Sequence, residues 1–240
     1  PPISYGTVIV EPRKVDIRMF KTFQQYARVP YLMKDLVAAI ERELGIVNSI
    51  IGGKFSDQAL RVLEANAKSI MTLRRYNSLQ KIEPVIEMVA QELRDHAYEK
   101  IVIFGIHRDT LIEVKDRMNS EFGSVLIYGG TRPSAIKERI YRFQHHKNCR
   151  VFLGNILSAG TSITLTAADQ VLFIDQDFVP GNNHQAAARC HRIGQTRPVT
   201  VRFVTLTNSI DQHIAQILSR KTEELTILLE GINQESPRLE

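Results

Sequence analysis

Two arginines, Arg189 and Arg192, stand three residues apart in a stretch that also holds Gln185 and three alanines. At this spacing both side chains would point from one face of a helix. A guanidinium group is always charged and binds oxyanions through a fork of N–H donors, so arginines delivered together from a short helix end suit a phosphate chain. Gly194 offers a helix stop, and Pro198 prevents continuation. The alternative interpretation is a solvated pair of surface charges.

A second candidate phosphate-binding segment covers residues 154–166, where small and hydroxyl-bearing residues surround Gly160. Backbone amides and hydroxyls that crowd together in this way can receive phosphate oxygens from a nucleotide or from a nucleic-acid backbone. The hydroxyl donors beside the glycine are Ser158, Thr161 and Ser162. The alternative is a tight strand-to-helix turn that is capped by serine or threonine.

A third segment, residues 128–133, places Gly130, Thr131 and Arg132 after an apolar run and before a basic helix. Flexible glycines, a hydroxyl and a guanidinium would suit a phosphate backbone. The charges of the following helix can equally form a solvated face. We therefore expect Thr131 and Arg132, at the carboxyl end of the strand, to make the contacts.

The acidic residues near these segments could suggest a metal site, but their spacing argues against one. Asp175 and Asp177 follow another apolar run, and acids two positions apart on an extended segment point to opposite faces. We expect Asp175 to organise the loop before Arg189 rather than to bind Mg²⁺. The sequence also lacks both the GxxxxGK[S/T] loop that cradles a triphosphate and a strand that ends in an Asp-Glu pair. A phosphoryl-transfer enzyme cannot be complete without these parts.

The elements that must position these segments follow from the apolar pattern after Lys100. Short continuous apolar runs are typical of strands that are buried on both faces of a parallel sheet. They alternate with helical stretches, which predicts a doubly wound α/β domain whose ligands bind at the carboxyl ends of the strands. The predicted strands are Ile101–Phe104, Val125–Tyr128, Val151–Leu153, Val171–Ile174 and Thr200–Val204, and the predicted helices are Asp109–Phe122, Ser134–His146 and Ile210–Leu229.

The N-terminal part of the chain has a helical pattern with irregular charge. Residues Thr7–Val10 could add a short strand, and Pro84 falls in the first turn of a predicted helix, where proline is tolerated. The predicted helices of this part are Leu32–Leu44, Ser56–Arg75 and Ile82–Leu93.

Composition and charge restrict the class of partner. The 240 residues carry a formal net charge of +5 and a pI near 9.3, a modest basic excess that favours nucleic acid over a membrane. No apolar run has the length of a membrane span, and the N-terminus lacks the pattern of a signal peptide. Cys149 and Cys190 indicate reduced thiols in an intracellular protein. We expect it in the cytoplasm if the source is bacterial or viral and in the nucleus if it is eukaryotic.

Several of these segments together resemble the helicase motifs of Swi/Snf-type DNA-dependent ATPases in helicase superfamily 2. Residues 185–195 resemble the sixth motif of that family, which is highly specific, and residues 158–169 resemble the fifth. The resemblance spans about Arg74 to Leu229. Its other parts are Lys100–Phe104, similar to the fourth motif, residues 128–131 with Arg139 and Phe143, similar to the segment after it, and residues 210–221, similar to the closing helix.

The resemblance implies two RecA-like lobes in a parent protein, with ATP in the cleft between them and double-stranded DNA across both. It implies that Arg192 reaches the γ-phosphate as an arginine finger, with Arg189 beside it, and that Gln185 and Gly160 also lie at the nucleotide. Hydrolysis would then depend on closure of the two lobes. ATP and Mg²⁺ would be bound mainly by the first lobe. The implied DNA contacts are Gly130, Thr131, Arg132, Ser158, Thr161 and Ser162.

We therefore predict an N-terminal strand and helical protrusion (1–76), the second RecA-like lobe of a Swi/Snf-type DNA translocase (77–231) and a tail (232–240). The parent would hydrolyse ATP, whereas the isolated chain is expected to be inactive. One alternative is a non-catalytic nucleic-acid-binding module that kept the fold. Another is an RNA-directed superfamily-2 helicase, against which residues 191–195 argue. We expect no membrane partner and no metal bound by this lobe alone.

Overall fold

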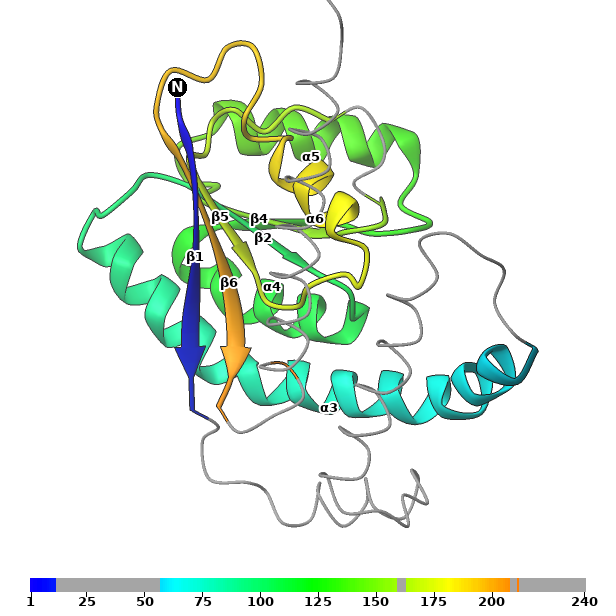
Figure 1. The fold of residues 1–240 in the computed structure, drawn as a ribbon. Coiled ribbons are helices and arrows are strands. Elements are labelled where there is room, and N and C mark those ends of the chain that lie inside the picture. The colour runs from blue at the N-terminus through cyan, green and yellow to red at the C-terminus, as the bar shows by residue number, and fades with distance from the viewer. Residues whose placement is uncertain (12–56, 159–162, 208–210, 212–240) are drawn as a thin grey trace, which may run out of the picture.

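The computed structural model describes residues 1–11, 57–158, 163–207 and 211, and within them the chain forms one parallel β-sheet with helices on both faces (Figure 1). The strand order is β1-β6-β5-β2-β4-β3, and each neighbouring pair runs parallel. The predicted doubly wound α/β class is therefore confirmed. The strands are β1 (Ile3–Val10), β2 (Ile101–Gly105), β3 (Ser124–Ile127), β4 (Val151–Asn155), β5 (Gln170–Phe173) and β6 (Val199–Leu206).

In the described part of the chain, two helices cover each face of the sheet, and each face has its own core. Alternate residues of β2 point to opposite cores: Ile101 and Ile103 pack with α3 and α4, while Val102 and Phe104 pack on the side of α5 and α6. Every residue of β2 is buried, which explains why this central strand has a continuous apolar sequence. The helices are α3 (Asp57–Arg94), α4 (Arg108–Phe122), α5 (Pro133–His145) and α6 (Pro180–Ala187).

Helix α3 is a single helix of 38 residues, although the sequence predicts a boundary before Pro84. That prediction is wrong, because Pro84 lies inside the helix. A proline in a helix interior costs about 3 kcal/mol. On the core side of the same part of α3, Val85, Val89 and Leu93 are fully buried. Full burial of each such side chain contributes roughly 1.5–3 kcal/mol, so packing against the sheet outweighs the cost of the proline.

The N-terminal strand is longer than the predicted Thr7–Val10, and it belongs to the sheet. β1 pairs with β6 along its whole length, from Ile3 opposite Val199 to Val10 opposite Leu206. The first residues of the chain therefore form one edge of the sheet, and β3 forms the other.

Several predictions fall on parts of the chain that the structure does not describe. The predicted helices Leu32–Leu44 and Ile210–Leu229 and the tail at 232–240 lie outside the described residues, apart from Asp211. The division of the chain at residue 76 stays a prediction. None of the described helices is long and apolar enough to cross a membrane.

Candidate nucleotide and nucleic-acid interface

The paired arginines lie in a loop that follows α6. The helix ends at Ala187, and the next residues form tighter turns: the Arg189 N–H donates to the Ala186 carbonyl (3.1 Å), and the Cys190 N–H donates to the Ala187 carbonyl (3.0 Å). Bonds to the third preceding residue tighten and end a helix. The prediction that Arg189 and Arg192 project from one face of a helix is therefore wrong.

The arginine loop, residues 188–198, is held by the segment that enters β5. The Arg189 carbonyl accepts a bond from the Leu165 N–H (2.9 Å). This bond to a distant segment replaces the bond that the carbonyl would accept if the helix continued. Gln195 is buried, and its amide nitrogen donates to the Ala168 carbonyl (2.8 Å). These contacts fix the backbone that carries both arginines.

Two side chains that the sequence motifs did not single out reinforce this arrangement. Arg197 forms an ion pair with Asp169 (3.1 Å) and donates to the Ala167 carbonyl (2.8 Å). Gln144 of α5 donates to the Thr164 carbonyl (3.0 Å) and accepts a bond from the Ala167 N–H (2.8 Å). Their roles depend on backbone groups far along the chain, so no local pattern could have predicted them.

Arg189 is a buried cation whose hydrogen bonding is incomplete. Only 5% of the residue is exposed, and its Nε has no hydrogen-bond partner among the described residues. Burial lowers the pKa of Arg189, and the neighbouring charge of Arg192 lowers it further. A desolvated guanidinium with an unpaired N–H favours an incoming anion. Arg192 is half-buried and Gln185 is exposed, so the loop can present both to a phosphate chain.

The loop after β3 folds back on itself. Gly130 has a φ of +90°, in the left-handed region that favours glycine. The Thr131 N–H donates to the Tyr128 carbonyl (3.0 Å), and the Tyr128 N–H donates to the Thr131 hydroxyl oxygen (3.1 Å). The hydroxyl oxygen closes the turn, and its proton can still be donated outward. Arg132 is exposed immediately before α5.

This loop lies beside the segment that follows β4. A Cβ atom on Gly129 would lie 3.3 Å from the Ser158 hydroxyl oxygen, so the two segments are in contact. Arg108, which begins α4 just after β2, adds a guanidinium near the same loop: its centre lies 4.1 Å from the Tyr128 ring centroid, and it donates to the Tyr128 hydroxyl (3.0 Å). The predicted site residues Gly160, Thr161 and Ser162 lie outside the described residues.

The two groups of predicted site residues lie at opposite ends of the parallel strands. We call these ends the carboxyl edge and the amino edge of the sheet. The loop at 128–132 and Ser158 follow the carboxyl ends of β3 and β4. The arginine loop contacts residues that precede β5 and runs into the start of β6, near the N-terminus of the chain (Figure 1). Only the first group therefore occupies the carboxyl edge, where the sequence predicted ligand binding, and the arginines lie at the amino edge.

A buried ionic cluster occupies the carboxyl end of β5. Asp175 is 4% exposed, its carboxylate lies 3.0 Å from the Lys81 ammonium, and it accepts a bond from the Ser78 hydroxyl (2.8 Å). Lys81 is 1% exposed and also pairs with Asp211 (2.9 Å). Asp175 is expected to organise the loop before Arg189; its carboxylate accepts bonds from α3 and from the Ile106 N–H just after β2 (3.4 Å).

Opposite charges keep the cluster ionised. Burial alone would raise the pKa of Asp175, but Lys81 and His107 hold it below the ordinary value. Burial alone would lower the pKa of Lys81, but Asp175 and Asp211 hold it above the ordinary value.

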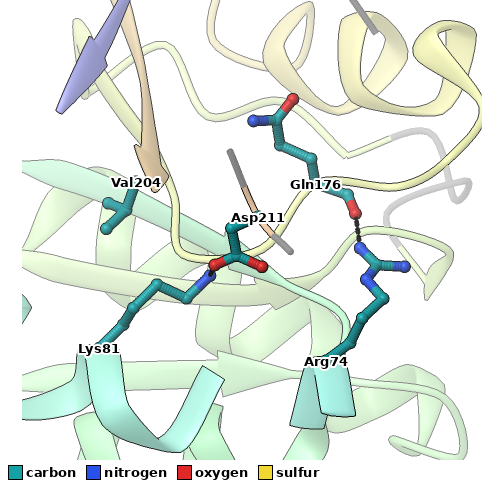
Figure 2. A pocket seen from close by; sticks show the side chains of 5 residues that line it. All are labelled: Arg74, Lys81, Gln176, Val204 and Asp211. Carbon is teal, nitrogen blue, oxygen red and sulfur yellow. Dashed lines mark hydrogen bonds and ion pairs between the residues drawn. The ribbon is translucent and has the colours of Figure 1, made fainter. Parts of the chain in front are cut away.

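The cavity beside this cluster is too small for a nucleotide. Its volume is about 10 Å³, which accommodates a single water molecule. Among the described residues, no group of three or more His, Cys, Asp or Glu side chains could hold a metal ion. Through Lys81 the cluster joins α3 to the end of β5 and to Asp211. The lining residues are Arg74, Lys81, Gln176, Val204 and Asp211 (Figure 2).

Comparison with known sequences shows that much of the chain is similar to the C-terminal domains of helicases. Residues 80–194 match the helicase conserved C-terminal domain family. The chain is 33% identical over 129 residues to the SWI/SNF-related matrix-associated actin-dependent regulator of chromatin subfamily A-like protein 1 of Drosophila melanogaster. It is 32% identical over 146 residues to the human lymphoid-specific helicase. These matches cover 53% and 60% of this chain but only 17% of each relative, so the chain spans a small part of their length.

Solved structures share the fold. The C-terminal part of the Fun30 ATPase domain has a TM-score of 0.63 at 17% identity, and the alignment covers 91% of this chain and 89% of that one. The Sulfolobus solfataricus SWI2/SNF2 ATPase core in complex with double-stranded DNA has a TM-score of 0.60 at 18% identity, with coverages of 90% and 44%. The fold and the sequence matches together support a RecA-like C-terminal lobe of the Swi/Snf type in helicase superfamily 2.

Proposed function

We propose that this chain is the second ATPase lobe of an ATP-dependent Swi/Snf-type DNA translocase and that its arginine loop completes a nucleotide site on a first lobe. The observation that carries the proposal is the buried Arg189 guanidinium, which keeps an unpaired N–H beside Arg192. A backbone that Gln195 holds in place lets these charges meet a phosphate chain without rearrangement.

In this proposal Arg192, the more exposed arginine, is the finger, and Arg189 and Gln185 support it. ATP with Mg²⁺ would supply the phosphoryl group that is transferred to water. Phosphoryl transfer spreads negative charge over the equatorial oxygens, and an arginine aimed at them contributes about 10³–10⁵-fold in rate. The sequence of this chain contains no triphosphate-cradling loop, so the chain alone is expected not to hydrolyse ATP.

The carboxyl edge of the sheet would bind the DNA backbone. Gly130 offers close backbone approach, Thr131 and Ser158 offer hydroxyls, and Arg132 offers an exposed guanidinium. We propose that Thr161 and Ser162 extend this surface. Contacts of these kinds go to phosphates and not to base edges, so binding would be independent of sequence.

The separation of the two surfaces supports translocation as the mechanical output. One lobe would hold DNA at the carboxyl edge of its sheet and the nucleotide at the amino edge. When the arginine loop closes on a nucleotide held by the first lobe, the whole lobe must rotate, and its DNA contacts move with it.

The substitution Arg192→Ala in the parent protein tests this function. DNA-stimulated ATP turnover should fall by at least about 10³-fold, while the dissociation constant for duplex DNA stays unchanged, because the two surfaces are separate. Arg94→Ala is the matched control and should change neither quantity, because Arg94 is an exposed arginine at the end of α3 that pairs with Glu121. Turnover close to that of the unsubstituted parent would contradict the finger assignment and favour a non-catalytic nucleic-acid-binding module.

A further inference from the structure

Helix α3 contacts the loop that joins β5 to α6 through side chains on one of its faces. Arg74, Ser78 and Lys81 follow one another at spacings of four and three residues, which aligns them along the helix. Ser78 and Lys81 both bind the Asp175 carboxylate, at 2.8 and 3.0 Å. The first residues of the loop are therefore fastened to α3.

Arg74 holds the middle of this loop. Its guanidinium donates to the Gln176 carbonyl, and its central carbon lies 4.1 Å from the centroid of the Phe178 ring (Figure 2 shows the first contact). A planar guanidinium can stack on an aromatic face while its N–H groups donate in the plane of the guanidinium. The ammonium of a lysine cannot do both. Arg74 is 4% exposed, so these contacts are shielded from water.

The far end of the loop is fastened to α6. The Asn183 side chain accepts a bond from the Asp177 N–H (2.8 Å) and donates to the Asp177 carbonyl (2.9 Å). The Asp177 carboxylate also accepts a bond from the Val179 N–H (2.8 Å), immediately before the helix begins. The loop is thus a short rigid link between α3 and α6.

Helix α6 leads directly to the arginines. Its buried residues Asn183, Ala186 and Ala187 pack it in place, and the Arg189 N–H bonds back to the Ala186 carbonyl (3.1 Å). A displacement of the β5–α6 loop therefore moves the start of the arginine loop.

We propose that Arg74 is a positioning residue for ATP hydrolysis: through Gln176, Phe178 and α6 it sets the place of Arg189 and Arg192, and it couples the arginine loop to the orientation of α3. The proposal rests on the nucleotide function proposed above. The first turns of α3 extend past the sheet, so a partner or a chain segment that tilts them would reach the arginines by this route (Figure 1).

Hydrogen–deuterium exchange on this chain tests the coupling without any ATPase measurement. Arg74→Gln should speed amide exchange at least tenfold across residues 176–192 and leave β2 and β4 unchanged. The matched control is Arg75→Gln, because Arg75 is the next residue, is exposed, and pairs with the exposed Asp109 (2.7 Å). Unchanged exchange in 176–192, or an equal increase throughout the sheet, would overturn the proposal.

ATP turnover in the parent protein is the second test of the coupling. Arg74→Gln should lower kcat for ATP at least tenfold at a temperature well below the thermal midpoint of the variant, with the KM for DNA close to that of the unsubstituted protein. Arg74→Lys should not restore kcat, because a lysine cannot bond the carbonyl and stack on Phe178 together. A lower thermal midpoint with unchanged kcat would show that Arg74 is merely structural.

The two proposals fail in different ways. Faster exchange in 176–192 together with normal turnover of the Arg192→Ala parent would refute the finger and keep the mechanical link. Normal exchange in the Arg74→Gln chain together with an inactive Arg192→Ala parent would refute the link and keep the finger.

Discussion

At the scale of single residues, burial and partners distinguish arginines that the sequence presents as equivalent. Arg202 of β6 binds both oxygens of Glu92 on α3, at 2.6 and 2.8 Å. Burial alone would raise the pKa of Glu92, but Arg202 and Tyr98 hold it below the ordinary value. Arg202 is therefore a structural tie between sheet and helix. Arg189 is more deeply buried, its Nε has no partner among the described residues, and the neighbouring charge is the cation Arg192, which suits it to an external anion.

His107 gives a prediction about pH at this scale. The residue is 9% exposed beside the Asp175 cluster, and its Nε2 has no hydrogen-bond partner in the described part of the chain. Burial lowers the pKa of His107, Arg74 and Lys81 lower it further, and Asp175 and Asp109 only partly offset this. The unfolded chain therefore binds the proton more readily than the folded one.

The free energy of unfolding should consequently decrease as the pH falls from about 6.5, the pKa of an unfolded histidine, to the lower pKa of His107 in the folded chain. The total decrease is about 1.4 kcal/mol for each unit by which the folded pKa lies below the unfolded one. Urea unfolding of the chain at several pH values between neutrality and mild acid measures this. In His107→Gln the slope across this window should disappear, whereas His145→Gln, at an exposed position, should keep it. An unaltered slope in His107→Gln would assign the effect to another group.

At the scale of elements, the junction between α4 and β3 depends on one glycine. Gly123 has a φ of +62°, and its N–H donates to the Asn119 carbonyl (3.1 Å) at the end of the helix. A Cβ atom there would lie 1.9 Å from the Asn148 carbonyl oxygen, a backbone atom that cannot move aside cheaply. The junction therefore excludes every side chain.

Gly123→Ala should lower the free energy of unfolding by clearly more than about 1 kcal/mol, because the left-handed backbone and the clash act together. Gly181→Ala is the matched control, since a Cβ atom at this position in α6 would meet nothing within 4 Å. Urea unfolding of both variants measures the difference. Equal stability of the two variants would show that the junction can rearrange.

At the scale of the whole molecule, the contacts proposed for nucleotide and for DNA lie at opposite ends of the strands of one sheet. The arginine loop lies at the amino ends of β5 and β6, and the loops proposed for DNA lie at the carboxyl ends of β3 and β4. If these loops bind DNA phosphates as proposed, the release of counterions would supply much of the affinity.

The affinity of this chain for duplex DNA should therefore fall steeply with salt. On a plot of the logarithm of the binding constant against the logarithm of salt concentration, Arg132→Ala should reduce the slope by about one. Arg192→Ala should leave the slope unchanged, because Arg192 is at the other edge. Fluorescence anisotropy with a labelled duplex measures both variants, and an affinity that does not respond to salt would contradict backbone binding.

The sequence by itself determined the sheet and most of its helices. Runs such as Ile101–Phe104 are apolar because a central parallel strand is buried on both faces. Such a run can be recognised from neighbouring residues alone. The candidate phosphate loops could be found for the same reason, since glycines and hydroxyls after a strand indicate a turn at its carboxyl end. The helix boundary predicted before Pro84 failed because packing of distant side chains outweighed a local rule.

Only the tertiary structure decided how the charged residues are used. The bond from Ser78 to Asp175 joins residues 97 apart in the chain, and that from Arg74 to Gln176 joins residues 102 apart. In the sequence, no local pattern distinguishes Arg74 and Lys81 from other charged residues, and Arg189 looks like part of a helix. Local periodicity cannot predict which polar groups a fold will bury together, because that depends on how helix and sheet meet, and this meeting placed the arginines at the amino edge.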